Sequence, residues 1–147
     1  MVTIIARELE VELVLSPERS VPVPARLVYR ADDPYAVHMT FHIGSDIPVH
    51  WTFGRDLLVE GVERACGEGD VRVWPSGPQH RRSLFLALRS PDGDALLRAS
   101  APEVAEWLER TLRAVPPGEE SDRIDADEVL YALLTARPAD DSGDGRR

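Results

Sequence analysis

The sequence predicts an α+β domain in which an antiparallel sheet is followed by C-terminal helices. Three patterns indicate this class. Apolar and polar residues alternate with a period of two through much of the first half of the chain, as in half-buried strands. The segments between these runs are short, which favours antiparallel pairing because parallel strands need long crossovers. Apolar residues with helical spacing are concentrated after residue 100.

The first two strands are predicted at residues 8–15 and 25–30. In the first of them, three glutamates alternate with apolar residues, and residues 16–18 end the pattern. Pro22 and Pro24 lead into the second strand. Because proline cannot donate a hydrogen bond to a strand ladder, these two residues exclude a central-strand position where they stand.

A hairpin and a short helix are predicted next. Residues 36–43 alternate again, and residues 49–53 form the partner strand after a turn at Gly44. A helix is expected from Arg55 to about Arg64, and it ends before Gly67.

Three further strands are predicted at residues 71–74, 83–89 and 95–98. The last two are joined by the pair Asp92 and Gly93. An Asp-Gly pair between apolar runs is a strong signal for a two-residue hairpin turn.

The segment after residue 99 has the start signals of a helix. Ser100 and Glu103 have the spacing of a capping box, and Pro102 stands in the first turn. The apolar residues at helical spacing are Val104, Trp107, Leu108, Leu112 and Val115. Residues 116–118, Pro-Pro-Gly, end this helix.

A last helix is predicted from a cap at Asp125 to the residue before Pro138. Glu128 completes its capping box, and Ile124 and Val129 are placed to form a hydrophobic staple. Residues 138–147 are acidic and polar, so we predict a disordered tail after a single domain at residues 1–137.

Composition indicates a cytoplasmic protein that is not inserted in a membrane. No apolar run approaches the roughly 20 residues that span a bilayer, and the N-terminus lacks a signal-peptide pattern. Cys66 is the single cysteine, which fits a reducing compartment. The net charge is −9, and all 17 basic residues are scattered arginines. This charge disfavours nucleic-acid binding.

The sequence offers no catalytic, cofactor-binding or metal-binding set. His38, His42 and His50 fall on two strands, where they are spread too widely to make a metal site the better interpretation. Cys66 has acidic neighbours, whereas a nucleophilic thiolate needs an electropositive setting. We therefore predict a protein that is not an enzyme.

A partner-contact surface is predicted around Trp74. Trp74 falls on the strand face opposite Val71 and Val73, beside Arg72, so it is expected to be exposed. Exposed Trp and Arg are enriched in interface hot spots. The predicted contact residues are Arg72, Trp74, Arg81 and Arg82. Trp51, Phe53 and Trp107 are predicted to lie in the core.

Sequence blocks throughout the chain resemble one known family. In chain order, and with some overlap, they are LVLSPERSVPVPARLVYRADDPYAV, DPYAVHMTFHIGSDIPVHWTFGRDLLVEG, GDVRVWPS, LRSPDGDALLRA and WLERTLRAVPPGEE. They are similar to blocks of the SsgA-like proteins, the sporulation and cell-division regulators of filamentous actinomycetes. The chain departs from that pattern mainly in residues 77–82 and after Pro138.

The resemblance implies a non-catalytic adaptor of sporulation-specific cell division. Members of this family govern where septa form, and some bring the tubulin-like division protein FtsZ to septum sites. Their fold is barrel-like, resembles the Whirly-type single-strand nucleic-acid-binding domains and can trimerise. The partners that the resemblance implies are division-machinery proteins, with FtsZ contacted directly or through a paralogue, and further copies of the chain, at division septa. No cofactor is expected.

Two alternatives from other functional classes stay open at this stage. A single-stranded nucleic-acid-binding regulator on the same fold would require Arg72, Trp74, Arg81 and Arg82 to converge on one exposed face. A hydrolase of cell-wall polymer would require a carboxylate pair and an export signal, and the export signal is missing from the N-terminus.

Overall fold

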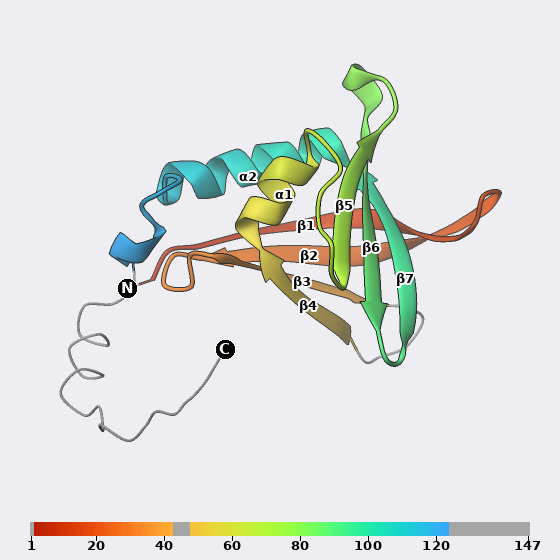
Figure 1. Ribbon diagram of the computed structural model, residues 1–147, viewed down its shortest axis with the longest axis horizontal. Coiled ribbons are helices and arrows are strands. Elements are labelled where there is room, and N and C mark those ends of the chain that lie inside the picture. The colour runs from red at the N-terminus through yellow and green to blue at the C-terminus, as the bar shows by residue number, and fades with distance from the viewer. Residues whose placement is uncertain (1, 43–47, 124–147) are drawn as a thin grey trace.

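The computed structural model describes residues 2–42 and 48–123, which form one curled antiparallel sheet with two helices (Figure 1). The strands are β1 (Ile4–Ser16), β2 (Arg19–Arg30), β3 (Ala36–His42), β4 (Pro48–Gly54), β5 (Val71–Ser76), β6 (Ser83–Ser90) and β7 (Gly93–Ser100). The helices are α1 (Arg55–Gly61) and α2 (Ala101–Ala114), with short 3-10 turns η1 (Gln79–Arg81) and η2 (Glu120–Arg123). The predicted α+β class is confirmed for these residues.

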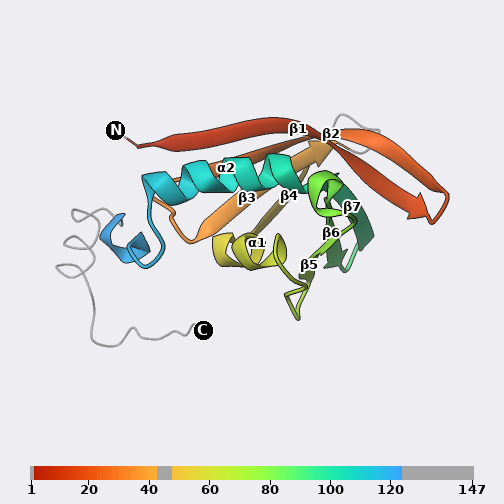
Figure 2. The ribbon, with the colours of Figure 1, turned by 90° about the horizontal axis from the view of Figure 1, so that it is seen from above.

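The sheet has the strand order β4-β3-β2-β1-β7-β6-β5, so β4 and β5 are its edges. Strand β1 pairs with β2 along its length but with β7 only at Glu12 and Leu13. Both helices lie on one face of the curled sheet, as the view from above shows (Figure 2). We call this the helix-covered face and the opposite one the outer face.

Burial follows the predicted period of two. In β1, Leu9, Val11 and Leu13 are buried on the helix-covered face, whereas Glu8 and Glu10 are exposed on the outer face. The buried positions of β2 to β7 alternate in the same way and join α1 and α2 in one hydrophobic core. This core fixes the register, because a slip by one residue would turn every apolar side chain of a strand outward.

Strand β2 is longer than predicted and includes both of its prolines. Pro22 and Pro24 lie opposite Glu12 and Glu10 of β1. On its other side, β2 pairs with β3 only over residues 25–28. The prolines therefore occupy a stretch of β2 that has a single neighbour, where a missing donor breaks no second ladder. The prediction that they exclude a central position holds for that stretch, but the prediction that the strand begins only at Ala25 is wrong.

Helix α2 starts as predicted, with one difference in its cap. The Ser100 side chain accepts a hydrogen bond from the Glu103 backbone N–H at 3.3 Å, and Pro102 stands in the first turn. The Glu103 carboxylate does not return to the cap but pairs with Arg7 of β1 at 3.3 Å. Trp107 is fully buried, as predicted. The predicted last helix and tail lie outside the described residues.

Gly61→Ala is expected to lower the free energy of unfolding by about 1–3 kcal/mol, the usual cost of overpacking. A Cβ added at Gly61 would lie 2.7 Å from the Cβ of Val73 and closer still to its Cγ1. Val73 is fully buried, so α1 and β5 would have to separate. Urea unfolding would measure the change. Gly69→Ala is the control, because nothing lies within 4 Å of its added Cβ. Equal midpoints for the two variants would contradict close packing of α1 on β5.

Candidate protein-contact surface

An aromatic pair lies on the outer face of the edge strand β5. Trp74 is directly opposite Phe85 of β6, and their rings stack with centroids 5.6 Å apart and planes inclined by 9°. Both side chains are half-exposed. Trp74 therefore lies on an edge strand as predicted, but its side chain is half-exposed and not fully exposed. Offset-stacked aromatic pairs of this kind hold large apolar surfaces in fixed positions.

The aromatic pair continues as a row across the outer face. Phe85 lies opposite Arg98 of β7, and Arg98 lies opposite Glu12 of β1. Arg98 donates a hydrogen bond of 3.4 Å to the Ser20 hydroxyl, and that hydroxyl donates one of 2.7 Å to the Glu12 carboxylate. The row therefore connects the edge strand to the β1–β2 hairpin.

A neighbouring row contains Arg72. It lies opposite Ala87, which lies opposite Leu96. Together with Trp74 these residues line an open groove on the outer face, with Val14 of β1 also in the lining. Arg72 is exposed and has no ion pair within the described part of the chain. The groove thus presents apolar side chains beside an unpaired cation.

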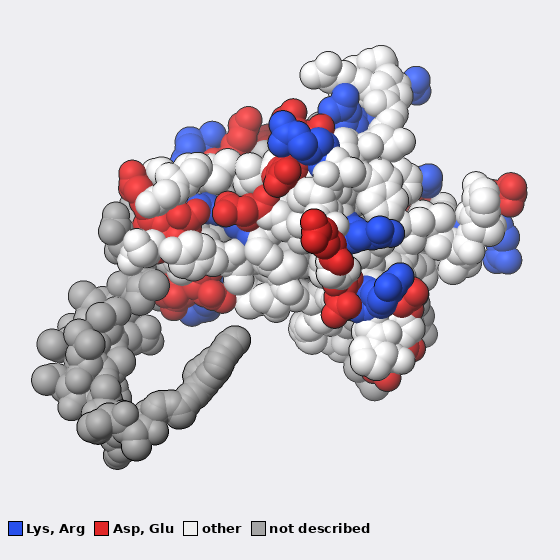
Figure 3. Space-filling model, in the orientation of Figure 1, with Lys and Arg blue, Asp and Glu red and all other residues white. Residues whose placement is uncertain are grey.

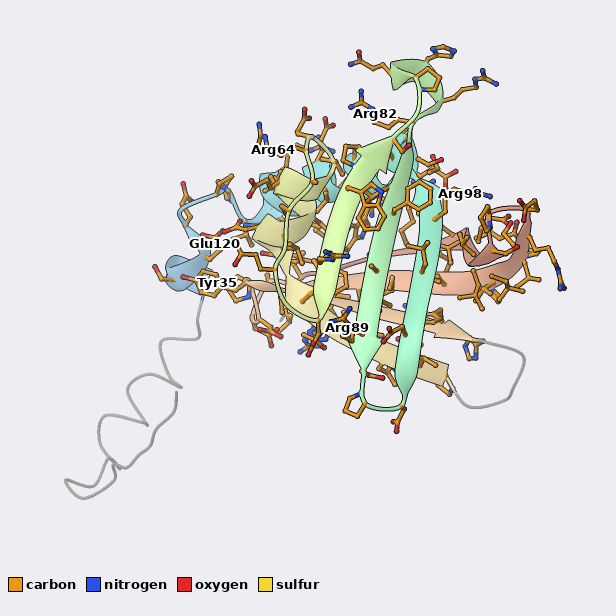
Figure 4. All side chains as sticks on the ribbon, turned by 45° about the vertical axis from the view of Figure 1, so that its right-hand side comes forward. Tyr35, Arg64, Arg82, Arg89, Arg98 and Glu120 are labelled. Atoms are coloured by element: carbon orange, nitrogen blue, oxygen red, sulfur yellow. The ribbon has the colours of Figure 1, made fainter. Side chains whose placement is uncertain are left out.

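The four predicted contact residues do not share one face. Arg72 and Trp74 lie together on the outer face of β5, and Arg81 is exposed in η1 at the end of the β5–β6 hairpin. The backbone at Arg82 is extended, so alternation places Arg82 on the side of Leu84, the helix-covered face. Figure 4 shows Arg82 where that hairpin turns over the end of the sheet.

Sequence reasoning missed Phe85, Leu96 and Arg98 as neighbours of Trp74. The alternation within residues 83–89 and 95–98 already placed them opposite the buried leucines of their strands. What was missing was the register between strands, which brings Phe85 rather than Ala87 opposite Trp74.

The three histidines of the central hairpin belong to a different part of the outer face. His38 Nε2 lies 3.0 Å from an Asp33 oxygen, and its Nδ1 lies 3.2 Å from the Thr52 hydroxyl. His50 Nδ1 lies 2.9 Å from the Thr40 hydroxyl. Asp33, His38 and Thr52 thus have the connectivity of a nucleophilic triad, but Asp33 and Thr52 are exposed and His38 is half-exposed, so water surrounds the three groups. Within the described residues, no three metal-ligating side chains group together.

Cys66 lies in the turn that covers part of the β5 edge. Its backbone N–H and C=O bond to Val73, and its thiol donates to the Leu57 carbonyl at 3.2 Å. Burial, followed by the charge of Glu60, raises the pKa of the thiol. A thiol that resists ionisation is a poor nucleophile, which agrees with its predicted structural role.

A buried ion pair joins Arg55, the first residue of α1, to Glu120 of η2, and neither residue lines the outer-face groove. Arg55 is 1 % exposed and donates to Glu120 at 2.9 Å and to the Thr111 carbonyl at 3.0 Å. Its guanidinium also lies 4.8 Å from the ring centroid of Tyr29. Hydrogen bonds from its own backbone and from Arg55 are the main causes that lower the pKa of Glu120. Figure 4 shows Glu120 near Tyr35.

The surface charges agree with the acidic composition. In the space-filling view, Arg side chains alternate with Asp and Glu, and no continuous basic field crosses the visible face (Figure 3). No helix among the described residues has the length and apolar character required to cross a membrane.

Comparisons with known proteins agree on one family. Residues 23–120 match the family model described as "Streptomyces sporulation and cell division protein, SsgA". The sporulation-specific cell division protein SsgB of Streptomyces coelicolor is 50% identical over 134 residues, which cover 91% of this chain and 98% of that protein. SsgB of Thermobifida fusca is 46% identical over 133 residues, covering 90% and 96%.

Solved structures show the same likeness in three dimensions. One comes from work on SsgB mutations that correlate with longitudinal cell division during sporulation of Streptomyces coelicolor. It has a TM-score of 0.80 and 51% identity, and the match covers 84% of this chain and 97% of that one. A crystal structure of an SsgA-like sporulation-specific cell division protein from Thermobifida fusca also has a TM-score of 0.80, with 45% identity and coverage of 90% and 96%.

Proposed function

Because the chain belongs to the SsgA family of sporulation and cell division proteins, we propose that it is a non-catalytic regulator that helps to position septa during sporulation. The observation that carries this proposal is the extent of the match to SsgB, which covers 98% of the Streptomyces coelicolor protein at 50% identity. A likeness over the whole length supports a shared role better than a shared motif would.

The proposed mode of action is the recruitment of the tubulin-like division protein FtsZ to the septum site, directly or through a relative of this chain. The protein would act in the cytoplasm at division septa, and it would work as a homo-oligomer. The raised pKa of the Cys66 thiol, which makes it a poor nucleophile, is in keeping with a non-catalytic role.

We also propose that Arg72, Trp74, Arg81 and Arg82 contact protein partners. Arg81 and Arg82 lie in the loop of residues 77–82, where the sequence departs from the family pattern. An exposed loop on a rigid hairpin is a suitable place for a contact that distinguishes one relative from another. We assign the division partner to this loop, which stands apart from the outer-face groove.

The nucleic-acid alternative receives no support from the geometry. It needs Arg72, Trp74, Arg81 and Arg82 on one exposed face, whereas Arg82 is on the helix-covered side. Single-strand binding also depends on a basic groove that follows the phosphates, and the chain has a net charge of −9.

The test is the position of a fluorescent fusion in sporulating filaments of the source organism, together with recovery of FtsZ on the purified fusion. We expect regular foci at septa and copurified FtsZ. The double variant Arg81→Ser, Arg82→Ser is expected to lose both. The matched control is Arg110→Ser, Arg113→Ser, which removes two exposed arginines from α2 and should keep both.

Each outcome bears on a different part of the proposal. Signal over the nucleoids, or diffuse signal throughout sporulation, would contradict the septal role of the protein. Septal foci without FtsZ would refute recruitment but not the septal role. If the Arg81, Arg82 variant behaves like the control, the loop is not the division-partner contact.

A further inference from the structure

The β1–β2 hairpin extends beyond the rest of the sheet as an arm, which we define as residues 14–22. Strand β1 pairs with β7 no further than Leu13, and β2 pairs with β3 no earlier than Ala25. Within the arm the two strands pair only with each other. In both ribbon views the tip projects past β7 and away from β5 (Figures 1 and 2). A two-stranded hairpin alone is marginally stable in water.

The arm carries apolar side chains that its own copy does not cover. Leu15 is 52% exposed and Val21 is 37% exposed. Val21 lies opposite Leu13 and shares its face, whereas Leu15 lies in the irregularity between Val14 and Ser16, next to the hairpin turn. They are two of only five large apolar side chains classed as exposed among the described residues. Such side chains at the end of a projecting element indicate a docking surface.

The outer-face groove of β5–β7 has the complementary character. Trp74, Ala87 and Leu96 line it, and all three are half-exposed. The ring of Phe85 stacks on that of Trp74. Backbone pairing with Cys66 and the missing N–H of Pro75 limit the free hydrogen-bonding groups along the β5 edge. An occupant would therefore lie on the face of the strands and not add a strand to their edge.

The charges of the arm and the groove also correspond. The arm tip carries Glu18 beside Arg19, both exposed. Exposed Arg72, Glu68 and Asp70 line the groove, together with exposed Arg89 and Asp94. None of these charged side chains of arm and groove forms an ion pair within the described residues. When two contacting surfaces carry opposite charges at matching positions, these charges set the orientation in which the surfaces bind.

We propose that the arm of one copy lies in the outer-face groove of a second copy, with Leu15 and Val21 against Trp74 and Leu96. Glu18 then pairs with Arg72, and Arg19 with the carboxylates of Glu68 and Asp70. Each copy gives an arm and receives one. Such a contact forms a closed assembly when the rotation between copies closes and an open filament when it does not, and the proposed assembly is the closed form. This inference rests on the homo-oligomer proposed above and names its contact, but it does not depend on the septal role. It leaves the 77–82 loop, none of whose residues lines the groove, free for the division partner.

The test is the mass of the purified full chain in solution, measured by analytical ultracentrifugation from about 1 to 100 µM, a range that spans moderate affinities. We expect a discrete assembly that dissociates on dilution. Leu15→Glu and Trp74→Ala should each raise its dissociation constant by about tenfold or more, as expected for central interface residues. The thermal midpoint of each monomer should stay close to that of the wild type.

The matched control is Ile4→Glu. Ile4 is also in β1 and is also 52% exposed, but it lies at the opposite end of the strand. This variant should assemble like the wild type. An equal loss of assembly in Ile4→Glu and Leu15→Glu would overturn the proposal, as would a wild-type chain that stays monomeric at the highest concentration.

Mixing two defective chains tests the pairing of arm with groove. The Leu15→Glu chain keeps an intact groove, and the Trp74→Ala chain keeps an intact arm. An equimolar mixture should therefore form a one-to-one complex at concentrations where each chain alone is mostly monomeric. If assembly instead joined arm to arm, the Trp74→Ala chain would assemble alone, and if it joined groove to groove, the Leu15→Glu chain would assemble alone. Either result, or a mixture that stays monomeric, would show that the proposal is wrong. Glu18→Arg combined with Arg72→Glu in one chain should recover assembly that each single change weakens.

Discussion

Trp107→Ala is expected to lower the free energy of unfolding by about 3–5 kcal/mol, the range for truncating a buried Trp. Trp107 is 0% exposed at the centre of α2, among the side chains that join the helix to the sheet. Its indole Nε1–H also donates to the Ile5 carbonyl at 3.2 Å, a contact between residues 102 positions apart. Truncation leaves a cavity and deprives the Ile5 carbonyl of this donor.

Two further tryptophan variants separate burial from the hydrogen bond. Trp107→Phe keeps most of the apolar contact but loses the indole donor, so it should cost less than the alanine variant. Trp74→Ala removes a half-exposed ring from the outer face and should change the unfolding free energy least. Urea unfolding of the three variants provides the comparison. A Trp107→Ala loss no larger than that of Trp74→Ala would show that α2 does not depend on this contact.

The burial of Trp107 was predictable, because apolar residues at helical spacing mark the face of a helix that packs on the core. The alternation of apolar residues likewise located the inward faces of β1 and β3, and Asp92-Gly93 marked the β6–β7 turn. These signals are local, and each is contained within a few turns of helix or one hairpin.

The candidate contact surface was only partly predictable, since it depends on pairing between strands. The pattern around Trp74 showed which way its side chain points, but the register that places Phe85 beside it depends on the loop of residues 77–82. Nothing in residues 14–22 shows that the arm extends beyond its neighbours, because this depends on where β3 and β7 stop pairing. Arg55 was expected to begin an ordinary short helix, and its burial follows from Glu120, 65 residues later.

Arg55→Met is expected to lower the free energy of unfolding by about 3 kcal/mol at neutral pH, as is usual when one partner of a buried ion pair is removed. The variant loses the hydrogen bonds to Glu120 and to the Thr111 carbonyl near the end of α2, as well as the contact with the Tyr29 ring. Methionine keeps much of the apolar volume, so the loss would come mainly from the charge and its hydrogen bonds. A stability equal to that of the wild type would contradict an ion pair in this position.

Glu120→Gln is expected to remove an acid-dependent part of the stability. In the folded chain, hydrogen bonds from the backbone N–H of Glu120 itself and then from Arg55 hold the pKa of this carboxyl below its ordinary value of 4.5. The unfolded chain therefore binds a proton more readily than the folded one. The stabilisation is fully present above pH 4.5 and is lost as the pH falls through the lower, folded pKa.

Urea unfolding from pH 7 to pH 3 would therefore show a difference between wild type and Glu120→Gln that is largest at neutral pH and shrinks in acid. The same comparison in the Arg55→Met background identifies the partner, because a double-mutant cycle isolates the interaction between neighbouring residues. Without Arg55, the glutamine substitution should cost much less, and its pH dependence should diminish. An unchanged acid dependence in that background would assign the lowered pKa to the backbone hydrogen bonds alone, and Arg55 would then hold the end of α2 through the Thr111 carbonyl and not through Glu120.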